Sequence, residues 1–120
     1  MELSFSLVPS YPVSRYVDVV ARAGRRGFDR LWVPDQGFHR DPFIALPAVG
    51  TCVDAIDLGI AVTNVFTRHP AQIARAAAAL GELRPGGVVL GLGAGERRVR
   101  DAVGGPDARF VEITRDAIMA

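Results

Sequence analysis

Residues 58–96 read LGIAVTNVFTRHPAQIARAAAALGELRPGGVVLGLGAGE. Two short apolar runs in this stretch, residues 58–62 and 88–92, suit strands that are covered on both faces. Between the runs, Pro70 suits the first position of a helix and His69 its N-cap; alanines extend the helix, and a Pro-Gly-Gly sequence ends it. The stretch therefore predicts a strand–helix–strand unit, which requires a parallel sheet.

Small and polar residues follow each of these strands at its carboxyl end. Thr63 and Asn64 come after the first strand, and residues 93–96, Gly-Ala-Gly-Glu, come after the second. Functional groups of such folds usually lie at these ends of the strands. Residues 91–95, Gly-x-Gly-x-Gly, differ from the Gly-x-Gly-x-x-Gly dinucleotide fingerprint, and no P-loop sequence follows. On the residues alone, these glycines indicate no more than a tight turn.

Similar strand and helix patterns precede this unit. Residues 3–8 alternate apolar and polar side chains, as a strand does, and residues 13–24 place apolar side chains on one face of a helix. Residues 30–33, Arg-Leu-Trp-Val, are expected to form a second short strand. Asp41 then suits an N-cap, and Pro42 suits the first position of a second helix.

The second helix and the end of the chain carry further expectations. Pro47 lies inside the helix that begins near Pro42, so we expect a kink or an early end there. Cys52 lies in the same apolar helix, so we expect a buried small hydrophobe and not a nucleophile. Residues 96–103 and 109–120 have helical patterns separated by a Gly-Gly-Pro sequence. The chain is thus predicted to contain four βα units.

Length limits how complete this fold is. The chain has 120 residues, whereas a (β/α)8 TIM barrel takes about 250. Four parallel strands form an open sheet or half of a barrel, and a half-barrel leaves edge strands and an apolar interior unprotected. We expect one partial domain over residues 1–120 that is a fragment, one half of an assembled pair or a natural short relative; the sequence favours the first two.

Composition excludes several classes of protein. The net charge is +1 and the 14 basic residues, all arginine, are scattered, so we expect no strong attraction to nucleic acid or to an anionic membrane. A single cysteine excludes an intrachain disulfide. No signal-peptide pattern, membrane span, metal-ligand spacing or nucleophile motif occurs. The default expectation is a soluble cytoplasmic protein.

The stretches TNVFTRHPAQIARAAAAL and GGVVLGLGAGE, with GFDRLWVPDQ and RDPFIAL before them, resemble the amino-terminal half of luciferase-like oxidoreductases. The closest resemblance is to the deazaflavin F420-dependent branch, which includes methylenetetrahydromethanopterin reductase and sugar-phosphate dehydrogenases. It implies a (β/α)8 barrel fold, of which about four units are present. It also implies hydride transfer between F420 and a small organic substrate. The FMN-dependent monooxygenases share much of the pattern, so FMN stays an alternative, as does an inactive half-barrel.

The resemblance also assigns roles to two residues after the second strand. Asp35 would lie beside the deazaflavin ring and take part in catalysis; otherwise it is a turn residue in a solvated loop. Gln36 would also contact the cofactor, but it replaces a catalytic histidine of some relatives, and an amide can hydrogen-bond but cannot titrate. We expect His39 to be an exposed loop side chain and not a catalytic base that takes the place of the missing histidine.

A second group of cofactor contacts is implied at the ends of the later strands. The resemblance places a non-prolyl cis peptide between Ala61 and Val62, behind the flavin ring, and lets Thr63 and Asn64 hydrogen-bond the ring or the ribityl chain. Without the resemblance these residues form a polar turn. Arg68 and His69 are expected to organise the start of the next helix.

The glycine-rich turn has its own implied role. Gly93, Ala94 and Gly95 would let the backbone approach the cofactor closely. Glu96 would donate a proton or stabilise charge at the deazaflavin; otherwise it is a helix N-terminal glutamate favoured by the macrodipole. A partner is expected as well, either in a homo-oligomer or as a second half-barrel chain. The phosphate site of such barrels commonly follows the seventh and eighth strands, which argues against tight cofactor binding by this chain alone.

Overall fold

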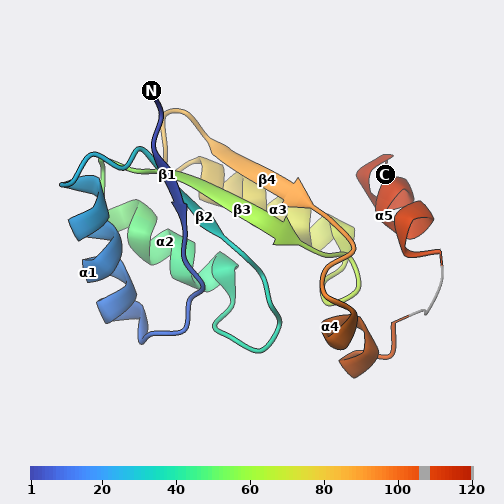
Figure 1. Cartoon of the computed structure of the whole chain (residues 1–120). Helices are drawn as coiled ribbons and strands as arrows, with labels where there is room; N and C mark the ends of the chain where they lie inside the picture. The colour runs from blue at the N-terminus through green and yellow to red at the C-terminus, as the bar shows by residue number, and fades with distance from the viewer. Residues whose placement is uncertain (106–108, 120) are drawn as a thin grey trace.

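The computed structural model describes residues 1–105 and 109–119. Its sheet has four parallel strands in the spatial order β1-β2-β3-β4, which is also their order in the chain (Figure 1). The predicted α/β class and the βα repeats are therefore confirmed. The strands are β1 (Ser4–Ser6), β2 (Arg30–Val33), β3 (Asp57–Thr63) and β4 (Val88–Leu92), and the helices that connect them are α1 (Val13–Gly24), α2 (Pro42–Cys52) and α3 (Pro70–Gly81).

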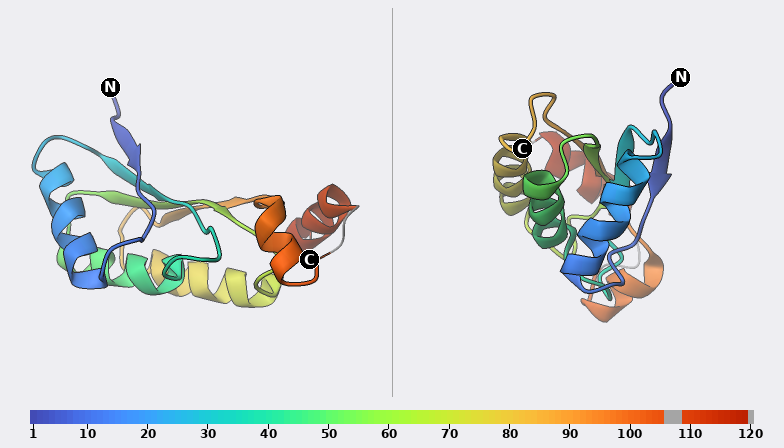
Figure 2. Two further views of the ribbon diagram at one scale, coloured as in Figure 1. Left: turned by 60° about the horizontal axis from the view of Figure 1, so that its bottom comes forward. Right: turned by 90° about the vertical axis from the view of Figure 1, so that its left-hand side faces the viewer.

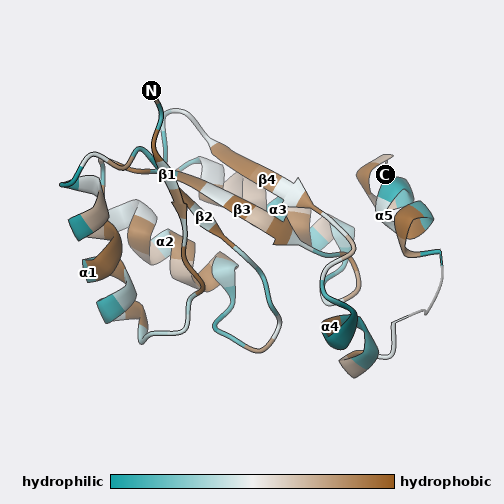
Figure 3. Ribbon diagram, viewed as in Figure 1, coloured by the Kyte–Doolittle hydropathy of each residue, from teal (hydrophilic) through white to brown (hydrophobic). Residues whose placement is uncertain are grey.

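The three connecting helices lie on one face of the sheet (Figure 2). Leu31, Val33, Leu58 and Ile60 of the central strands are buried against them. The same core includes buried helix residues: Tyr16, Val20, Phe43, Ala45, Leu46, Val49, Ile73 and Leu80. Figure 3 shows the strands as mostly hydrophobic, as expected for a sheet that is covered by helices.

The other face of the sheet is more open. Successive residues of a strand point to opposite faces, so Trp32, Gly59 and Val89, which are paired in register, point away from the three helices. The Trp32 ring lies over Gly59, because a Cβ atom there would come within 2.5 Å of it. Val89 is 45% exposed. This is the face that would line the interior of a complete barrel.

Two helices begin where their sequence predicts. The carboxylate of Asp41 accepts a hydrogen bond of 2.8 Å from the backbone N–H of Phe43, with Pro42 in the first turn. The imidazole Nδ1 of His69 accepts one of 3.2 Å from the backbone N–H of Ala71. Both bonds satisfy donors that a helix N-terminus leaves free, so local chemistry defines these two starts.

One of the two alternatives for Pro47 and the expectation for Cys52 are wrong. The helix does not end early at Pro47 but continues to Cys52; a kink at Pro47 stays a prediction. Burial of Leu46 and Val49 beyond the proline keeps this segment on the core, and packing outweighs the backbone hydrogen bond that a proline cannot donate. Cys52 is exposed, not buried, because the buried face of α2 passes through Val49 and Gly50 and leaves the cysteine outside it.

Two more helices follow the sheet. α4 (Arg97–Ala102) and α5 (Phe110–Met119) lie beyond the carboxyl ends of β3 and β4 (Figure 1). They correspond to the predicted helices at 96–103 and 109–120, although Pro106 of the predicted break and Ala120 lie outside the described residues. In the part of the chain that the structure describes, no helix combines the length and apolar character that crossing a membrane requires.

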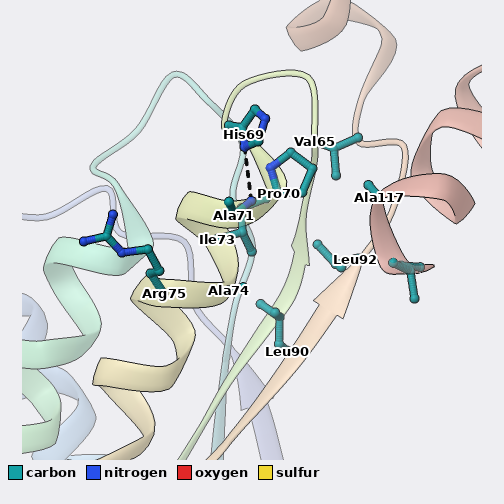
Figure 4. A pocket seen from close by; sticks show the side chains of 11 residues that line it. Val65, His69, Pro70, Ala71, Ile73, Ala74, Arg75, Leu90, Leu92 and Ala117 are labelled. Atoms are coloured by element: carbon teal, nitrogen blue, oxygen red, sulfur yellow. Dashed lines mark hydrogen bonds between the residues drawn. The ribbon is translucent and has the colours of Figure 1, made fainter. Parts of the chain in front are cut away.

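An apolar cavity of about 650 Å³ lies between α3, β4 and α5. Figure 4 shows Val65, Leu90 and Leu92 on one side of it and Ala117 of α5 on the other. Because Leu90 is packed against the core, this cavity lies on the helix side of the sheet. Val65 and His69 of the loop after β3 contribute to its lining, but none of the predicted cofactor-binding or catalytic residues does.

Candidate functional site

The end of β3 is irregular where the site was predicted. Ile60 pairs with Leu90 and Thr63 with Leu92, so β3 has one residue more than β4 between these pairs. This is the arrangement of a β-bulge, which re-aims side chains. The peptide bond between Ala61 and Val62 is cis, at the position that the family resemblance implied. The Val62 side chain is 38% exposed at this end of the sheet.

Gly91 and Gly93 lie directly against this bulge. A Cβ atom at Gly91 would come within 2.8 Å of the carbonyl oxygen of Ile60, and one at Gly93 within 3.0 Å of the Val62 side chain. The immediate role of these glycines is therefore to let β4 approach β3. Val62, Gly91 and Gly93 lie together at this end of the sheet, and we call these three residues the apolar platform.

Asp35 and Thr63 are joined at the same end of the sheet. The Thr63 hydroxyl donates a hydrogen bond of 2.8 Å to the Asp35 carboxylate, and the Asp35 backbone N–H donates one of 3.2 Å to the carbonyl of Val62. Thr63 is fully buried, whereas Asp35 is half-buried. The loop after β2 is thus fixed to the bulge, with a carboxylate held in one orientation.

Asn64 shapes the turn that follows. Its side-chain oxygen accepts hydrogen bonds from the backbone N–H groups of Phe66 and Thr67, at 3.1 and 3.0 Å, and from the Thr67 hydroxyl at 3.2 Å. Its side-chain nitrogen is buried and has no partner among the described residues. Gly95 lies beside that nitrogen, since a Cβ atom there would come within 3.2 Å of it. A buried donor without a partner costs about 1–3 kcal/mol, so this amide is a candidate ligand contact.

Glu96 follows the glycine-rich turn at the N-cap position of α4. Its side chain makes no capping hydrogen bond. Its nearest cation is Arg98, at 3.9 Å, and both side chains are more than half exposed. A pair of this kind contributes little, so the carboxylate is largely free. The backbone N–H of Gly93 donates to the carbonyl of Thr63 at 3.1 Å, which brings this turn to the bulge of β3.

The remaining predicted residues have clear positions. Gln36 is half-buried and His39 is exposed; His39 and Asp35 line a second cavity, of about 230 Å³. Arg68 forms an ion pair with Asp41 and stacks on the Phe43 ring. Arg68 thus ties the loop after β3 to the start of α2, whereas the start of the next helix, α3, is capped by His69. Within residues 1–105 and 109–119, no three His, Cys, Asp or Glu side chains are placed to hold a metal ion.

Two contacts of α4 were not foreseen from the sequence. Arg100 donates from Nη1 to the carbonyls of Ala94 and Gly95, at 3.1 and 2.6 Å. Val99 packs on Gly37, where a Cβ atom would come within 2.8 Å of it. No spacing rule distinguishes Arg100 among 14 arginines, because its carbonyl partners are set by the turn geometry.

Comparison with known proteins agrees with this architecture. The model of the family described as luciferase-like monooxygenase matches residues 4–120. The 5,10-methylenetetrahydromethanopterin reductase of Methanolobus tindarius is 33% identical over 120 residues, which are all of this chain and 37% of that protein. This chain therefore spans a little over a third of the length of that relative.

Solved structures show the same fold. The coenzyme F420-dependent tetrahydromethanopterin reductase of Methanopyrus kandleri superposes with a TM-score of 0.81 at 25% identity, over 88% of this chain and 30% of that one. The oxygenating constituent of 3,6-diketocamphane monooxygenase of Pseudomonas putida, in complex with FMN, gives a TM-score of 0.82 at 17% identity, over 99% and 38% of the two chains; that likeness concerns the fold alone. On the family model and the reductase relative, this chain belongs to the luciferase-like monooxygenase family.

Proposed function

We propose that this chain is the amino-terminal half of an F420-dependent oxidoreductase that transfers a hydride between the deazaflavin and a small organic substrate. One observation carries the proposal: the buried Asn64 amide nitrogen has no partner, and it lies at the carboxyl end of β3, close to Gly95. The apolar platform and two carboxylates belong to the same end of the sheet. A flat heteroaromatic ring with polar edges suits such surroundings.

The residues present fit a deazaflavin. When bound, the cofactor supplies the hydride, while the protein supplies binding and orientation. Ala61 and Val62 would support the ring from behind, and Thr63 and Asn64 would face its polar groups. Residues 93–95, Gly-Ala-Gly, would lie along its edge with little bulk.

Two carboxylates would have different roles in the reaction. Asp35, oriented by the Thr63 hydroxyl at 2.8 Å, would hold its charge beside the ring, with Gln36 as a hydrogen-bonding neighbour. Glu96, whose side chain has no capping bond, would give or accept a proton at its carboxylate oxygen. A carboxylate in this role contributes about 10²–10⁴-fold to rate. Neither role requires a metal ion.

The open face of the sheet supports a further part of the proposal. The exposed Val89 and the uncovered edges of β1 and β4 leave apolar surface and backbone groups for another half of the barrel to cover. We propose that this half is supplied by more of the same protein, by a second half-barrel chain or by another copy. An inactive half-barrel is the alternative if none is supplied.

A second candidate is an FMN-dependent monooxygenase. Its support is the fold shared with the FMN-bound monooxygenase constituent of Pseudomonas putida. Reduced FMN can activate oxygen, whereas F420 is a two-electron hydride carrier that reacts poorly with it. The two cofactors therefore separate the two functions.

The test is a thermal melt of the protein alone and with saturating F420 or FMN. A ligand that binds the folded state stabilises it by about 2.7 kcal/mol at a hundred times its Kd. We expect F420 to raise the midpoint and FMN to leave it unchanged. A shift by FMN alone would favour the monooxygenase, and a melt insensitive to both would overturn cofactor binding by this chain.

A further inference from the structure

Arg100 of the short helix α4 donates hydrogen bonds back to the turn that precedes the helix. One of its terminal nitrogens donates to two successive carbonyls, those of Ala94 and Gly95, at 3.1 and 2.6 Å. The guanidinium also lies 4.7 Å from the ring centroid of Phe110 in α5. Charge-assisted hydrogen bonds of this kind are about twice as strong as neutral ones. The side chain therefore clamps the turn just before Glu96.

The other contacts of Glu96 do little to fix its position. Its side chain has no capping bond, and its ion pair with Arg98, at 3.9 Å, joins two largely exposed groups. Gly95 has a φ of +70°, a conformation that glycine adopts without steric cost but does not enforce. The carbonyl clamp by Arg100 is thus the main described side-chain contact that holds this turn in place.

The same helix reaches the other acidic segment. Val99, adjacent to Arg100, is 3% exposed and packs on Gly37, two residues beyond Asp35. α4 therefore contacts both the Asp35 loop and the Glu96 turn. A shift of α4 would move both segments together. Arg100, which holds α4 against the preceding turn, therefore affects the position of both segments.

We propose that Arg100 is a positioning residue for the cofactor site: by holding the Ala94 and Gly95 carbonyls, it fixes the Gly-Ala-Gly-Glu turn against Asn64 in the form that receives the deazaflavin. This inference rests on the proposed function. Arg100 acts through the turn and does not itself touch the reacting atoms. Lysine can reach a carbonyl but lacks the planar fork of donors, so it is expected to replace arginine in part.

The experiment measures F420 affinity of the intact protein by fluorescence titration. Four proteins are compared: wild type, R100A, R100K and the control R97A, since Arg97 is 81% exposed and pairs with Asp101 at 3.6 Å. We expect R100A to weaken F420 binding about tenfold and R100K to restore part of the loss. R97A should bind as wild type does.

Chemical rescue separates positioning from a general loss of structure. Millimolar guanidinium ion should restore binding to R100A, because it can occupy the space of the missing group and donate to the same carbonyls. It should leave wild type and R97A unchanged. The melting midpoint of each protein is also measured. If R100A is less stable than wild type, the role of Arg100 is judged from the F420 affinity of R100K and from the rescue by guanidinium.

The outcomes are distinguishable. Wild-type protein that binds no F420 overturns the proposed function, and the role of Arg100 with it. Wild-type binding together with R100A and R100K that bind equally well overturns the role of Arg100 alone. A loss in R100A that guanidinium does not restore, with R100K no better, also overturns it and leaves a purely structural contact.

Discussion

The hydroxyl of Thr63 donates a hydrogen bond of 2.8 Å to the carboxylate of Asp35, which lies 28 residues earlier in the chain. Thr63 ends β3 and Asp35 follows β2, and these strands are neighbours in the sheet. The bond thus fixes the direction of an acid at the carboxyl end of the strands. Because Thr63 is fully buried, water does not compete for its hydroxyl.

Replacing Thr63 with valine tests this relationship. Valine keeps the shape but removes the donor, so T63V should lose about 1 kcal/mol of stability and bind F420 several-fold more weakly. T63S, which keeps the hydroxyl, is the matched control. Denaturant unfolding and a fluorescence titration measure the two effects. Equal F420 affinity of T63V and wild type would show that the orientation of Asp35 does not matter.

The close approach of β4 to β3 depends on glycines, which have no side chain. A methyl group at Gly91 would meet the Ile60 carbonyl oxygen at 2.8 Å, and one at Gly93 would meet Val62 at 3.0 Å. We expect G91A and G93A to destabilise the fold by about 1–3 kcal/mol, as overpacking does. G86A is the control, because nothing lies within 4 Å of a Cβ atom there. Midpoints of urea unfolding compare the three, and G91A and G93A as stable as G86A would contradict the close contact.

Asp41 has two separable roles. Its carboxylate caps α2 at Phe43 with a bond of 2.8 Å and forms an ion pair with Arg68. D41A should lose about 1–2 kcal/mol, the usual cost of removing an N-cap. D41N keeps a capping oxygen and loses only the charge, so its cost should stay below about 1 kcal/mol. If unfolding experiments show the two variants equally destabilised, the cap is not the larger contribution.

Tyr16 links α1 to the end of β1. Its hydroxyl donates a bond of 2.7 Å to the carbonyl of Leu7, and burial raises the pKa of the phenol well above its ordinary value. The folded pKa is therefore higher than the unfolded one. The stabilisation from the neutral phenol is complete below about pH 10 and is lost as the pH rises above that value.

Y16F is expected to cost about 1 kcal/mol at neutral pH and to flatten the decline of stability at alkaline pH. The chain has no lysine, so side-chain ammonium groups add nothing to the titration in this range. Y11F should keep the decline, since Tyr11 is 37% exposed. Unfolding free energies between neutral and alkaline pH decide the matter; a decline in Y16F as steep as in wild type would exclude Tyr16 as its cause.

Glu96 provides a prediction about chemistry. E96Q keeps the size of the side chain and removes its proton exchange, so turnover of F420 and substrate should fall about 10²-fold or more with little change in F420 affinity. E82Q, at the C-cap of α3, is the control. Steady-state rates and a binding titration separate the two effects. Unchanged turnover in E96Q would assign the proton transfer to another group.

The elements of this chain were predictable where local chemistry defines them. The strands expected at 30–33 and 88–92 coincide with β2 and β4, and Pro42 and Pro70 begin α2 and α3. A proline at the first helical position and a polar cap before it act through bonds within three residues. These signals need no distant partner, so they are present in the sequence itself.

Contacts between distant segments could not be predicted from the sequence. Whether Cys52 lies inside the core depends on the rotation of α2 about its axis, which its almost uniformly apolar sequence does not define. The partners of Gly91 and Gly93 proved to be β3 itself, because the bulge of that strand turns Val62 toward them. Such contacts depend on how the strands are placed beside one another.

The sequence by itself determined the order of strands and helices and the two capped helix starts, because each follows from residues near one another in the chain. It also indicated the family, because four stretches spread along the chain resemble it. The tertiary structure alone decided that Thr63 holds Asp35, that the Asn64 amide is left without a partner and that Arg100 clamps the turn before Glu96. The first relationship depends on the register and bulge of adjacent strands, which a shift of one residue would change. The other two depend on the turn that brings Gly95 close to Asn64 and its carbonyl to Arg100.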